Sequence, residues 1–294
     1  MRLDTAATFD RALVLGPGGV LGTAWMAGLA AGLRRAGVDL GEADLTVGTS
    51  AGAIVGALLA TGQDIDRLAA PARKPAAAAA AAPGRGADPA VMGSVFAVLG
   101  DAGLERGEAR RRVGRIALDH AGSDPAAEQA LLAGRGALIG ATAWPDRPLL
   151  VTAVDAVTGE PVVWDRTSGV PLVHAVAASS AFPGAEPPVG VQGRRYMDGA
   201  LRAGTNADLA AGAGTLVVVE PLAHLFPREQ LEQQLRAVGA RTVVTVGPDP
   251  DAIRAFGADL QDRAHWEPAF RAGLAQAPAT ADRLRPAWKP ASAR

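Results

Sequence analysis

A serine between two glycines gives the first indication of chemistry in this chain, in the pentapeptide GTSAG at residues 48–52. A short β-like run precedes it at 45–47, and a helix-like run of small residues follows at 51–60. A serine on a sharp strand-to-helix turn exposes its hydroxyl group, and the free N–H groups of the following helix favour a developing negative charge. Two interpretations compete: Ser50 is a nucleophile on a strained turn, or it caps the helix.

A glycine-rich loop, GPGGVLG at residues 16–22, also follows a β-like run, at 11–15, and precedes a helical one. Loops of this kind can turn several N–H groups toward one anion. A dinucleotide site would instead require the pattern G-x-G-x-x-G. That pattern fails at Leu21 when it is counted from Gly16, and it fails immediately when it is started at Pro17. The loop therefore favours an anion cradle over a nucleotide site.

The segment YMDGA at residues 196–200 is the third place that could carry chemistry. Asp-Gly is a common turn, and that is the simpler interpretation. An aspartate after a β-like run can also be a general base, and serine hydrolysis needs a group that takes the hydroxyl proton. No Ser-His-Asp triad can be assigned, because the histidines lie far apart and none has a distinctive setting. The four are His120, His174, His224 and His265.

The composition of the 294 residues excludes several classes of protein. A net charge of −1, with acids and bases interspersed, argues against nucleic-acid binding. The absence of cysteine excludes disulfides, thiol catalysis and cysteine-bound zinc, and the histidines have no metal-ligand spacing. Residues 1–16 do not have the pattern of a signal peptide, and no apolar run has membrane-spanning length. We expect a soluble, cytoplasmic protein without a metal or a cofactor.

The order of β-like and helix-like runs predicts an α/β fold with a parallel sheet covered by helices. We expect one domain over residues 11–276, between an N-terminal tail at 1–10 and a loose C-terminal tail at 277–294. Within it, residues 71–145 form a variable, lid-like insertion. The alanine-rich stretch at 71–89 is either a mobile lid edge or a surface loop without function. Arg110, Arg111 and Arg112 form a solvated face or, as the alternative, a site for lipid head groups.

Taken together, GPGGVLG, GTSAG and DGA resemble, in type and order, the motifs of the patatin-like phospholipases. Those motifs are a glycine-rich oxyanion loop, a G-x-S-x-G elbow and a later Asp-Gly-Gly/Ala. The segments SSAFPGAEPPV and RRYMDGALRAGTNADLA are also similar to that family, and the resemblance covers residues 11–220. It implies a three-layer α/β/α sandwich with a mostly parallel central sheet, and hydrolysis of lipid acyl esters through an acyl-serine intermediate.

The resemblance also implies a role for each site residue. Ser50 would be the nucleophile of a serine–aspartate dyad that needs no histidine, and Asp198 would accept its proton and later activate water. The N–H groups of Gly18 and Gly19 would stabilise the oxyanion. Two positions depart from the family: Pro17, which has no N–H, stands where the glycine run usually begins, and Leu21 replaces a basic residue that could contact phosphate.

The leading hypothesis is a lipid acyl hydrolase, whose partner is a lipid or other ester substrate. One alternative is an acyltransferase that uses the same serine, although such transferases usually pair the serine with a histidine. The other is a catalytically silent relative that binds a lipid or a protein partner, and Pro17 is the feature in its favour. Transient contact with a membrane surface is compatible with the sequence, which leaves the oligomeric state open.

Overall fold

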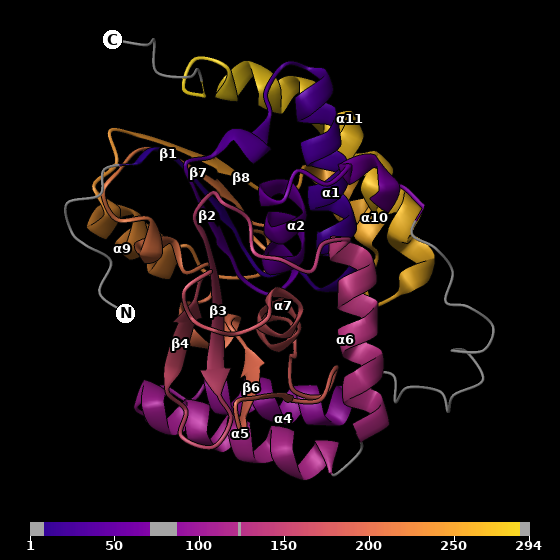
Figure 1. Cartoon of the computed structure of the whole chain (residues 1–294), viewed down its shortest axis with the longest axis vertical. Coiled ribbons are helices and arrows are strands. Elements are labelled where there is room, and N and C mark those ends of the chain that lie inside the picture. The colour runs from indigo at the N-terminus through magenta and orange to yellow at the C-terminus, as the bar shows by residue number, and fades with distance from the viewer. Residues whose placement is uncertain (1–8, 71–86, 123–124, 289–294) are drawn as a thin grey trace.

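The protein, described by a computed structural model over residues 9–70, 87–122 and 125–288, is built around an eight-stranded sheet (Figure 1). The strand order is β5-β6-β3-β2-β1-β7-β8, and β4 pairs with β3 off this path. The strands are β1 (Phe9–Leu15), β2 (Leu45–Gly48), β3 (Leu149–Asp155), β4 (Pro161–Trp164), β5 (Val189–Val191), β6 (Arg194–Asp198), β7 (Ala213–Val219) and β8 (Thr242–Val246).

Helices and short 3₁₀ turns connect these strands. The helices are α1 (Gly19–Arg35), α2 (Ala51–Ala60), α4 (Pro89–Leu99), α5 (Arg106–Ala121), α6 (Pro125–Ile139), α7 (Leu172–Ser179), α8 (Ala200–Ala203), α9 (Glu229–Val238), α10 (Pro250–Phe256) and α11 (Trp266–Leu284). The 3₁₀ turns are η1 (Leu40–Glu42), η2 (Ile65–Leu68), η3 (Ala207–Ala210) and η4 (Arg263–His265).

The sheet is parallel at its centre and antiparallel at one side. Strands β3, β2, β1, β7 and β8 run parallel to one another, whereas β4 and β6 are antiparallel to β3, and β5 is antiparallel to β6. Parallel neighbours need long crossovers, and α1 and α2 provide two of them. The predicted α/β fold with a mostly parallel sheet is confirmed.

Side chains that alternate along the strands divide the core between the two faces of the sheet. On one face, Leu13 and Leu15 of β1 pack with α1, α2 and α11, and β3 packs beneath α6 and α7. On the other face, Ala12 and Val14 pack with η3 and α9, and Val154 packs with α4, α5 and α8. The sheet is therefore the middle of three layers, as the resemblance to the patatin-like phospholipases implied.

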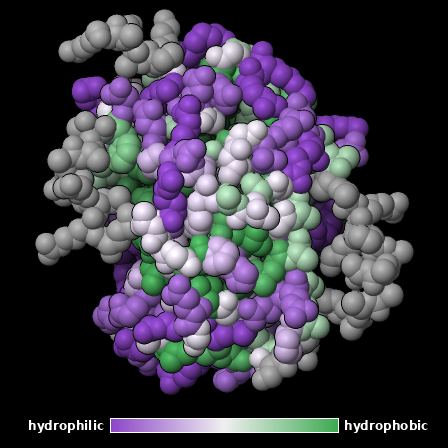
Figure 2. Space-filling model, viewed as in Figure 1, coloured by the Kyte–Doolittle hydropathy of each residue, from purple (hydrophilic) through white to green (hydrophobic). Residues whose placement is uncertain are grey.

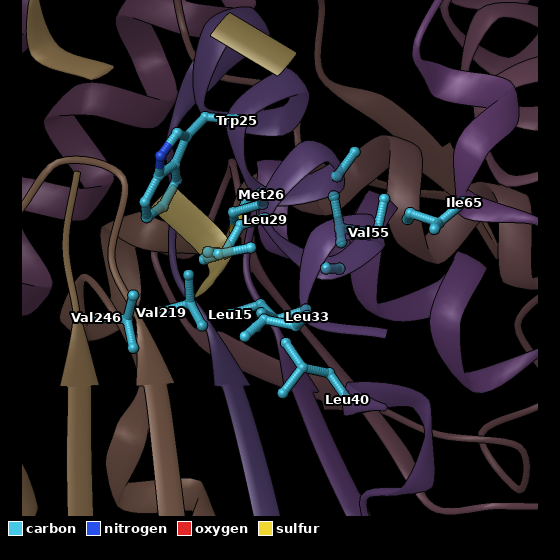
Figure 3. Close-up of a cluster of buried hydrophobic side chains, with 14 of the residues drawn as sticks. Leu15, Trp25, Met26, Leu29, Leu33, Leu40, Val55, Ile65, Val219 and Val246 are labelled. Carbon is cyan, nitrogen blue, oxygen red and sulfur yellow. The ribbon is translucent and has the colours of Figure 1, made fainter. Parts of the chain in front are cut away.

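The largest buried cluster lies between α1 and the centre of the sheet (Figure 3). In Figure 3 the side chain of Leu29 of α1 lies above Leu15 of β1 and Val219 of β7, and the side chain of Leu33 of α1 lies beside Leu15. All four side chains are almost completely buried. This packing fixes the position of the loop between β1 and α1, which contains the glycine-rich sequence.

Helix α11 continues beyond residue 276, so the prediction of a loose tail at 277–294 was wrong over the residues described. Ala277, Ala281 and Leu284 of this helix and Trp288 after it are buried in the core. The sequence pattern did not indicate a helix here for two reasons. The buried face of this part of α11 consists mostly of alanines, and Pro278, which interrupts helical hydrogen bonding, lies inside the helix. Residues 289–294 lie outside the described residues.

Within the predicted insertion at 71–145, helices account for most of the described residues. Helix α6 packs against α2 and α7 and supplies Leu131 and Ile139 to the core. The alanine run lies outside the described residues. Among the residues that are described, no helix has both the length and the apolar character needed to cross a bilayer.

Close contact between α1 and α11 generates a prediction about stability. A Cβ added at Gly28 would lie 1.9 Å from the carbonyl oxygen of Phe270, and one at Gly273 would lie 2.1 Å from that of Trp25. Gly28→Ala should therefore lower the free energy of unfolding by about 1–3 kcal/mol, because the helices must separate. Denaturant unfolding followed by circular dichroism measures the change.

Gly134→Ala in α6 is the matched control, because nothing lies within 4 Å of the added Cβ. This substitution should leave stability unchanged or raise it by up to about 1 kcal/mol, since alanine has the higher helix propensity. Equal effects of the two substitutions would contradict the close packing of α11 on α1.

Candidate active site

Ser50 occupies a strained turn between β2 and α2. Its backbone angles are φ 56° and ψ −119°, a conformation that non-glycine residues rarely adopt. A Cβ at Gly48 would lie 2.6 Å from Ala53 Cα, and one at Gly52 would lie 1.9 Å from the carbonyl oxygen of Leu15. Both glycines are thus needed because the turn is packed against the neighbouring backbone.

The Ser50 side chain does not cap helix α2. Its Oγ donates a hydrogen bond instead to Asp198 Oδ2, over 2.7 Å. The backbone N–H of Ser50 donates to Ser179 Oγ at 3.0 Å. The structure thus brings together two side chains that are 148 positions apart in the sequence, at the end of β2 and the end of β6.

The Asp198 carboxylate is buried, with 1% of the residue exposed. Its other oxygen, Oδ1, accepts a hydrogen bond from the N–H of Ala200 at 2.8 Å. Burial raises the pKa of Asp198 from its ordinary value of 3.8 to about 7. The Ala200 N–H, the Ser50 hydroxyl and the positive charge of Arg135 oppose that rise in pKa. A carboxyl group with this pKa can both take up and release a proton near neutral pH.

Asn206 joins the turn that carries Ser50 to the turn that carries Asp198. Its side-chain amide donates to Thr49 Oγ1 at 2.9 Å and to the carbonyl oxygen of Gly199 at 3.1 Å. The same nitrogen lies within hydrogen-bond distance of Thr152 Oγ1 and the Gly204 carbonyl oxygen. Thr49 and Thr152 also hydrogen-bond to each other at 3.1 Å.

The position of Asn206 is itself fixed by its neighbours. The residue is fully buried and has a left-handed backbone, with φ 60°. Its Oδ1 accepts a hydrogen bond from Arg202 Nη1 at 2.9 Å, and Arg202 in turn forms two hydrogen bonds with the carboxylate of Asp208. Sequence reasoning did not assign a role to Asn206. The only signal was its place in the segment that resembles the patatin-like family.

Arg135 is a second residue that sequence reasoning missed. It lies on α6, and its guanidinium donates to Ser180 Oγ at 2.8 Å and pairs with Glu186 at 3.1 Å. Burial lowers the pKa of Arg135, whereas the charge of Glu186 raises it. Ser180 follows Ser179, which binds the backbone of the Ser50 turn. A cation therefore lies near the Ser50–Asp198 pair, and no local motif marks it.

The glycine-rich loop is hydrogen-bonded directly to the serine turn. The N–H of Gly52 donates to the carbonyl oxygen of Gly16 at 3.2 Å, and the N–H of Thr49 donates to that of Leu15 at 3.0 Å. In the described part of the chain, no acceptor occupies the N–H of Gly18 or Gly19. Two unoccupied donors thus lie in a loop fixed against the turn that carries Ser50.

Glycine is required at three positions of this loop and of the turn after Asp198, either because a Cβ would collide with a neighbour or because φ is positive. A Cβ at Gly18 would lie 2.8 Å from Pro221, and Gly19 has a positive φ of 62°. A Cβ at Gly199 would lie 2.2 Å from Thr152 Oγ1. Leu21 is buried in the core, where it packs with other residues of α1 and the sheet.

In the described ranges, no histidine hydrogen-bonds to Ser50 or Asp198, and no cluster of histidine and acidic residues could hold a metal ion. His174 lies on α7, where its Nδ1 is buried without a partner. His265 pairs with Asp262 at 2.8 Å.

Comparison with solved structures finds distant likenesses. The chain is 12% identical to VipD from Legionella pneumophila, with a TM-score of 0.45 and coverage of 93% of this chain and 67% of that one. It is 20% identical to the type III effector protein ExoU, with a TM-score of 0.36 and coverage of 92% and 53%. ExoU in complex with SpcU, from the type III secretion system of Pseudomonas aeruginosa, gives 20% identity, a TM-score of 0.32 and coverage of 90% and 52%. The chain thus spans about half the length of the ExoU chains.

No curated protein matches the chain. Among protein families, the sequence model described as patatin-like phospholipase matches residues 13–211, a range that contains Ser50, Asp198 and the glycine-rich loop. Because this match extends over more than half of the sequence, the chain belongs to the patatin-like phospholipase family.

Proposed function

We propose that this protein hydrolyses carboxylic ester bonds of lipids, with Ser50 as the nucleophile and Asp198 as the general base. Membership of the patatin-like phospholipase family supports lipid ester hydrolysis in general. The observation that carries the specific proposal is the 2.7 Å hydrogen bond from Ser50 Oγ to the buried Asp198 carboxylate. A base must lie within hydrogen-bond reach of the proton that it removes.

In the first half-reaction, Asp198 takes the hydroxyl proton of Ser50 while Oγ attacks the carbonyl carbon of the ester. The carbonyl oxygen becomes an oxyanion, which the N–H groups of Gly18 and Gly19 stabilise. When the tetrahedral intermediate collapses, the bond to the leaving alcohol breaks and Asp198 returns the proton to the alcohol oxygen. The acyl group remains esterified to Ser50.

In the second half-reaction, Asp198 takes a proton from a water molecule, whose oxygen attacks the acyl-serine carbonyl. The second tetrahedral intermediate releases the fatty acid, and the proton returns to Ser50 Oγ. The pKa of Asp198, raised to about 7 by burial, suits both directions of proton transfer. Pro17 cannot donate a hydrogen bond, so in this mechanism it shapes the loop rather than contacting the oxyanion.

Substitution of the two reacting residues tests the mechanism. Ser50→Ala removes the nucleophile and Asp198→Asn removes the base, so each should lower ester hydrolysis by about 10³-fold or more. We would measure the hydrolysis of p-nitrophenyl esters over a range of acyl lengths. Circular dichroism and thermal unfolding would show whether each variant is folded.

Ser94→Ala and Asp282→Asn are the matched controls, because both residues are exposed and hydrogen-bond only within their own helix or to Arg285, away from Ser50, Asp198 and the glycine-rich loop. Both should keep wild-type activity. Product analysis in mixtures of water and an alcohol would separate hydrolysis from acyl transfer. Full activity in folded Ser50→Ala or Asp198→Asn protein would contradict the mechanism.

The pH dependence of the rate should report the protonation of Asp198. Only the carboxylate can accept the serine proton, so the rate should rise with pH through about 7, the pKa of Asp198. Arg135 lowers this pKa through its positive charge. Arg135→Gln should therefore move the rise in rate to higher pH, which a pH–rate profile for a soluble ester would measure.

Arg271→Gln, at an exposed position on α11, should leave the midpoint of the pH–rate profile unchanged. A wild-type rate that does not vary between acidic and alkaline pH would contradict the role of Asp198. An unchanged midpoint in Arg135→Gln would instead show that Arg135 has no electrostatic effect on that carboxylate.

Asn206 should act as a positioning residue for the reacting pair. Asn206→Ala removes the amide that joins Thr49 to Gly199, so kcat should fall by about 100-fold while KM changes little, since small misplacements are costly. Steady-state kinetics on a soluble ester measure both parameters.

Gln234→Ala is the matched control for Asn206→Ala. Gln234 is also a buried amide, and it binds the Ala203 carbonyl oxygen and the Ala207 N–H of the same segment without touching Thr49 or Gly199. Both variants should be less stable. Only in Asn206→Ala should the fall in kcat be much larger than the fall in the fraction of folded protein. Equal kinetic effects would indicate a structural role alone.

A further inference from the structure

Helix α4 has an unusual composition for a helix at the surface. Its sequence, PAVMGSVFAVL, contains no charged residue, and Val95 is its one buried residue. Phe96 and Leu99 are 46% and 40% exposed. A helix on the surface of a globular protein normally turns a polar face outward. The exposed side of α4 instead carries small residues without charge (Ala90, Gly93, Ser94 and Ala97), next to the partly exposed Phe96 and Leu99.

Three large side chains form a stripe on this helix, which we call the α4 stripe: Met92, Phe96 and Leu99. Their spacing of four and three residues places them on one face. The ring of Phe96 lies 5.6 Å from that of Phe182. A Cβ at Gly184 would lie 2.9 Å from Met92 Cγ, so the helix is in close contact with the segment after α7.

The segment that contacts the α4 stripe also forms hydrogen bonds with the backbone of both reacting residues. Ser179, at the end of α7, accepts the hydrogen bond from the Ser50 N–H. Two residues later, the carbonyl oxygen of Ala181 accepts a hydrogen bond from the N–H of Asp198 at 3.1 Å. Phe182 follows directly. The α4 stripe therefore packs against the segment whose backbone and side chains hydrogen-bond to Ser50 and Asp198.

Basic side chains lie on α5, the helix that packs against α4 at the lower end of Figure 1. Arg111, Arg112 and Arg115 are exposed, and all three pair with one carboxylate, that of Glu108. Three arginines to one glutamate leave an excess of positive charge. Figure 2 shows hydrophobic surface among hydrophilic surface at this end of the molecule.

We propose that the α4 stripe docks on a lipid surface that contains anionic headgroups, with the α5 arginines contacting those headgroups. Binding of this kind grows with the apolar area inserted and with attraction to anionic lipids. The stripe offers apolar side chains without a charged residue that would select a particular protein partner. This inference rests on the proposed function, because a lipid surface is where lipid esters are found.

Vesicle co-sedimentation of Ser50→Ala protein tests the proposal without any contribution from turnover. The vesicles are either phosphatidylcholine alone or phosphatidylcholine mixed with phosphatidylglycerol. Phe96→Gln with Leu99→Gln should lower binding to the mixed vesicles at least about tenfold, because the inserted apolar area is lost. Arg112→Gln with Arg115→Gln should lower binding to the mixed vesicles by about tenfold but leave weak binding to phosphatidylcholine unchanged.

Leu225→Gln with Phe226→Gln is the matched control. Both residues are 52% exposed, which is at least as exposed as Phe96 and Leu99, but they follow β7 and do not belong to the α4 stripe. This variant should bind mixed vesicles as the parent protein does. We call the variant with Phe96→Gln and Leu99→Gln the α4 pair. Vesicle binding that falls equally in the α4 pair and in this control, or that does not fall in the α4 pair, would overturn the proposal.

Two further measurements separate the proposal from its alternatives. Wild-type protein should hydrolyse a soluble short-chain ester whether or not vesicles are present, so intact hydrolysis of that ester without vesicle binding would overturn only the docking inference. Sedimentation velocity would show whether the stripe joins two copies of the chain instead. A dimer that the α4 pair converts to monomers, without any vesicle binding by the parent, would overturn the lipid surface as the occupant.

Discussion

The hydrogen bond between Ser50 and Asp198 imposes the main constraint on this fold, because both partners are held under unfavourable conditions. The carboxylate is removed from water, which raises its pKa to about 7. The serine has a backbone conformation of a kind that costs about 1–3 kcal/mol. A protein with a net stability of about 5–15 kcal/mol can keep such features only if surrounding contacts fix them.

Those surrounding contacts come from several separate elements. Strand β1 binds the serine turn through Leu15 and Gly16, and α7 binds it through Ser179. Asn206 reaches from the segment before η3 to both turns. Because each contact comes from a different part of the chain, the site is assembled only when all three layers have packed. The cores on both faces of the sheet thus contribute to the geometry of one hydrogen bond.

The alternation of β-like and helix-like runs was sufficient to predict a parallel sheet covered by helices, whereas the three layers were implied by the resemblance to the family. The sequence also pointed to Ser50, because a tight strand-to-helix turn leaves no room for a Cβ at the positions of Gly48 and Gly52. The pairing of Ser50 with Asp198 came from resemblance alone, since no local pattern relates residues 148 positions apart. Arg135 and Asn206 act through tertiary contacts, and no sequence pattern marks such contacts. The end of α11 was mistaken for a tail because its buried face consists of alanine.

Reaction with a fluorophosphonate tests the activation of Ser50 by Asp198 most directly. Peptide mass spectrometry would locate the adduct, and the labelling rate would be followed against pH. The account predicts a single adduct on Ser50, a rate that rises with pH through about 7, and almost no labelling of folded Asp198→Asn protein. An adduct on another serine, or rapid labelling of Ser50 in the Asp198→Asn variant, would contradict it.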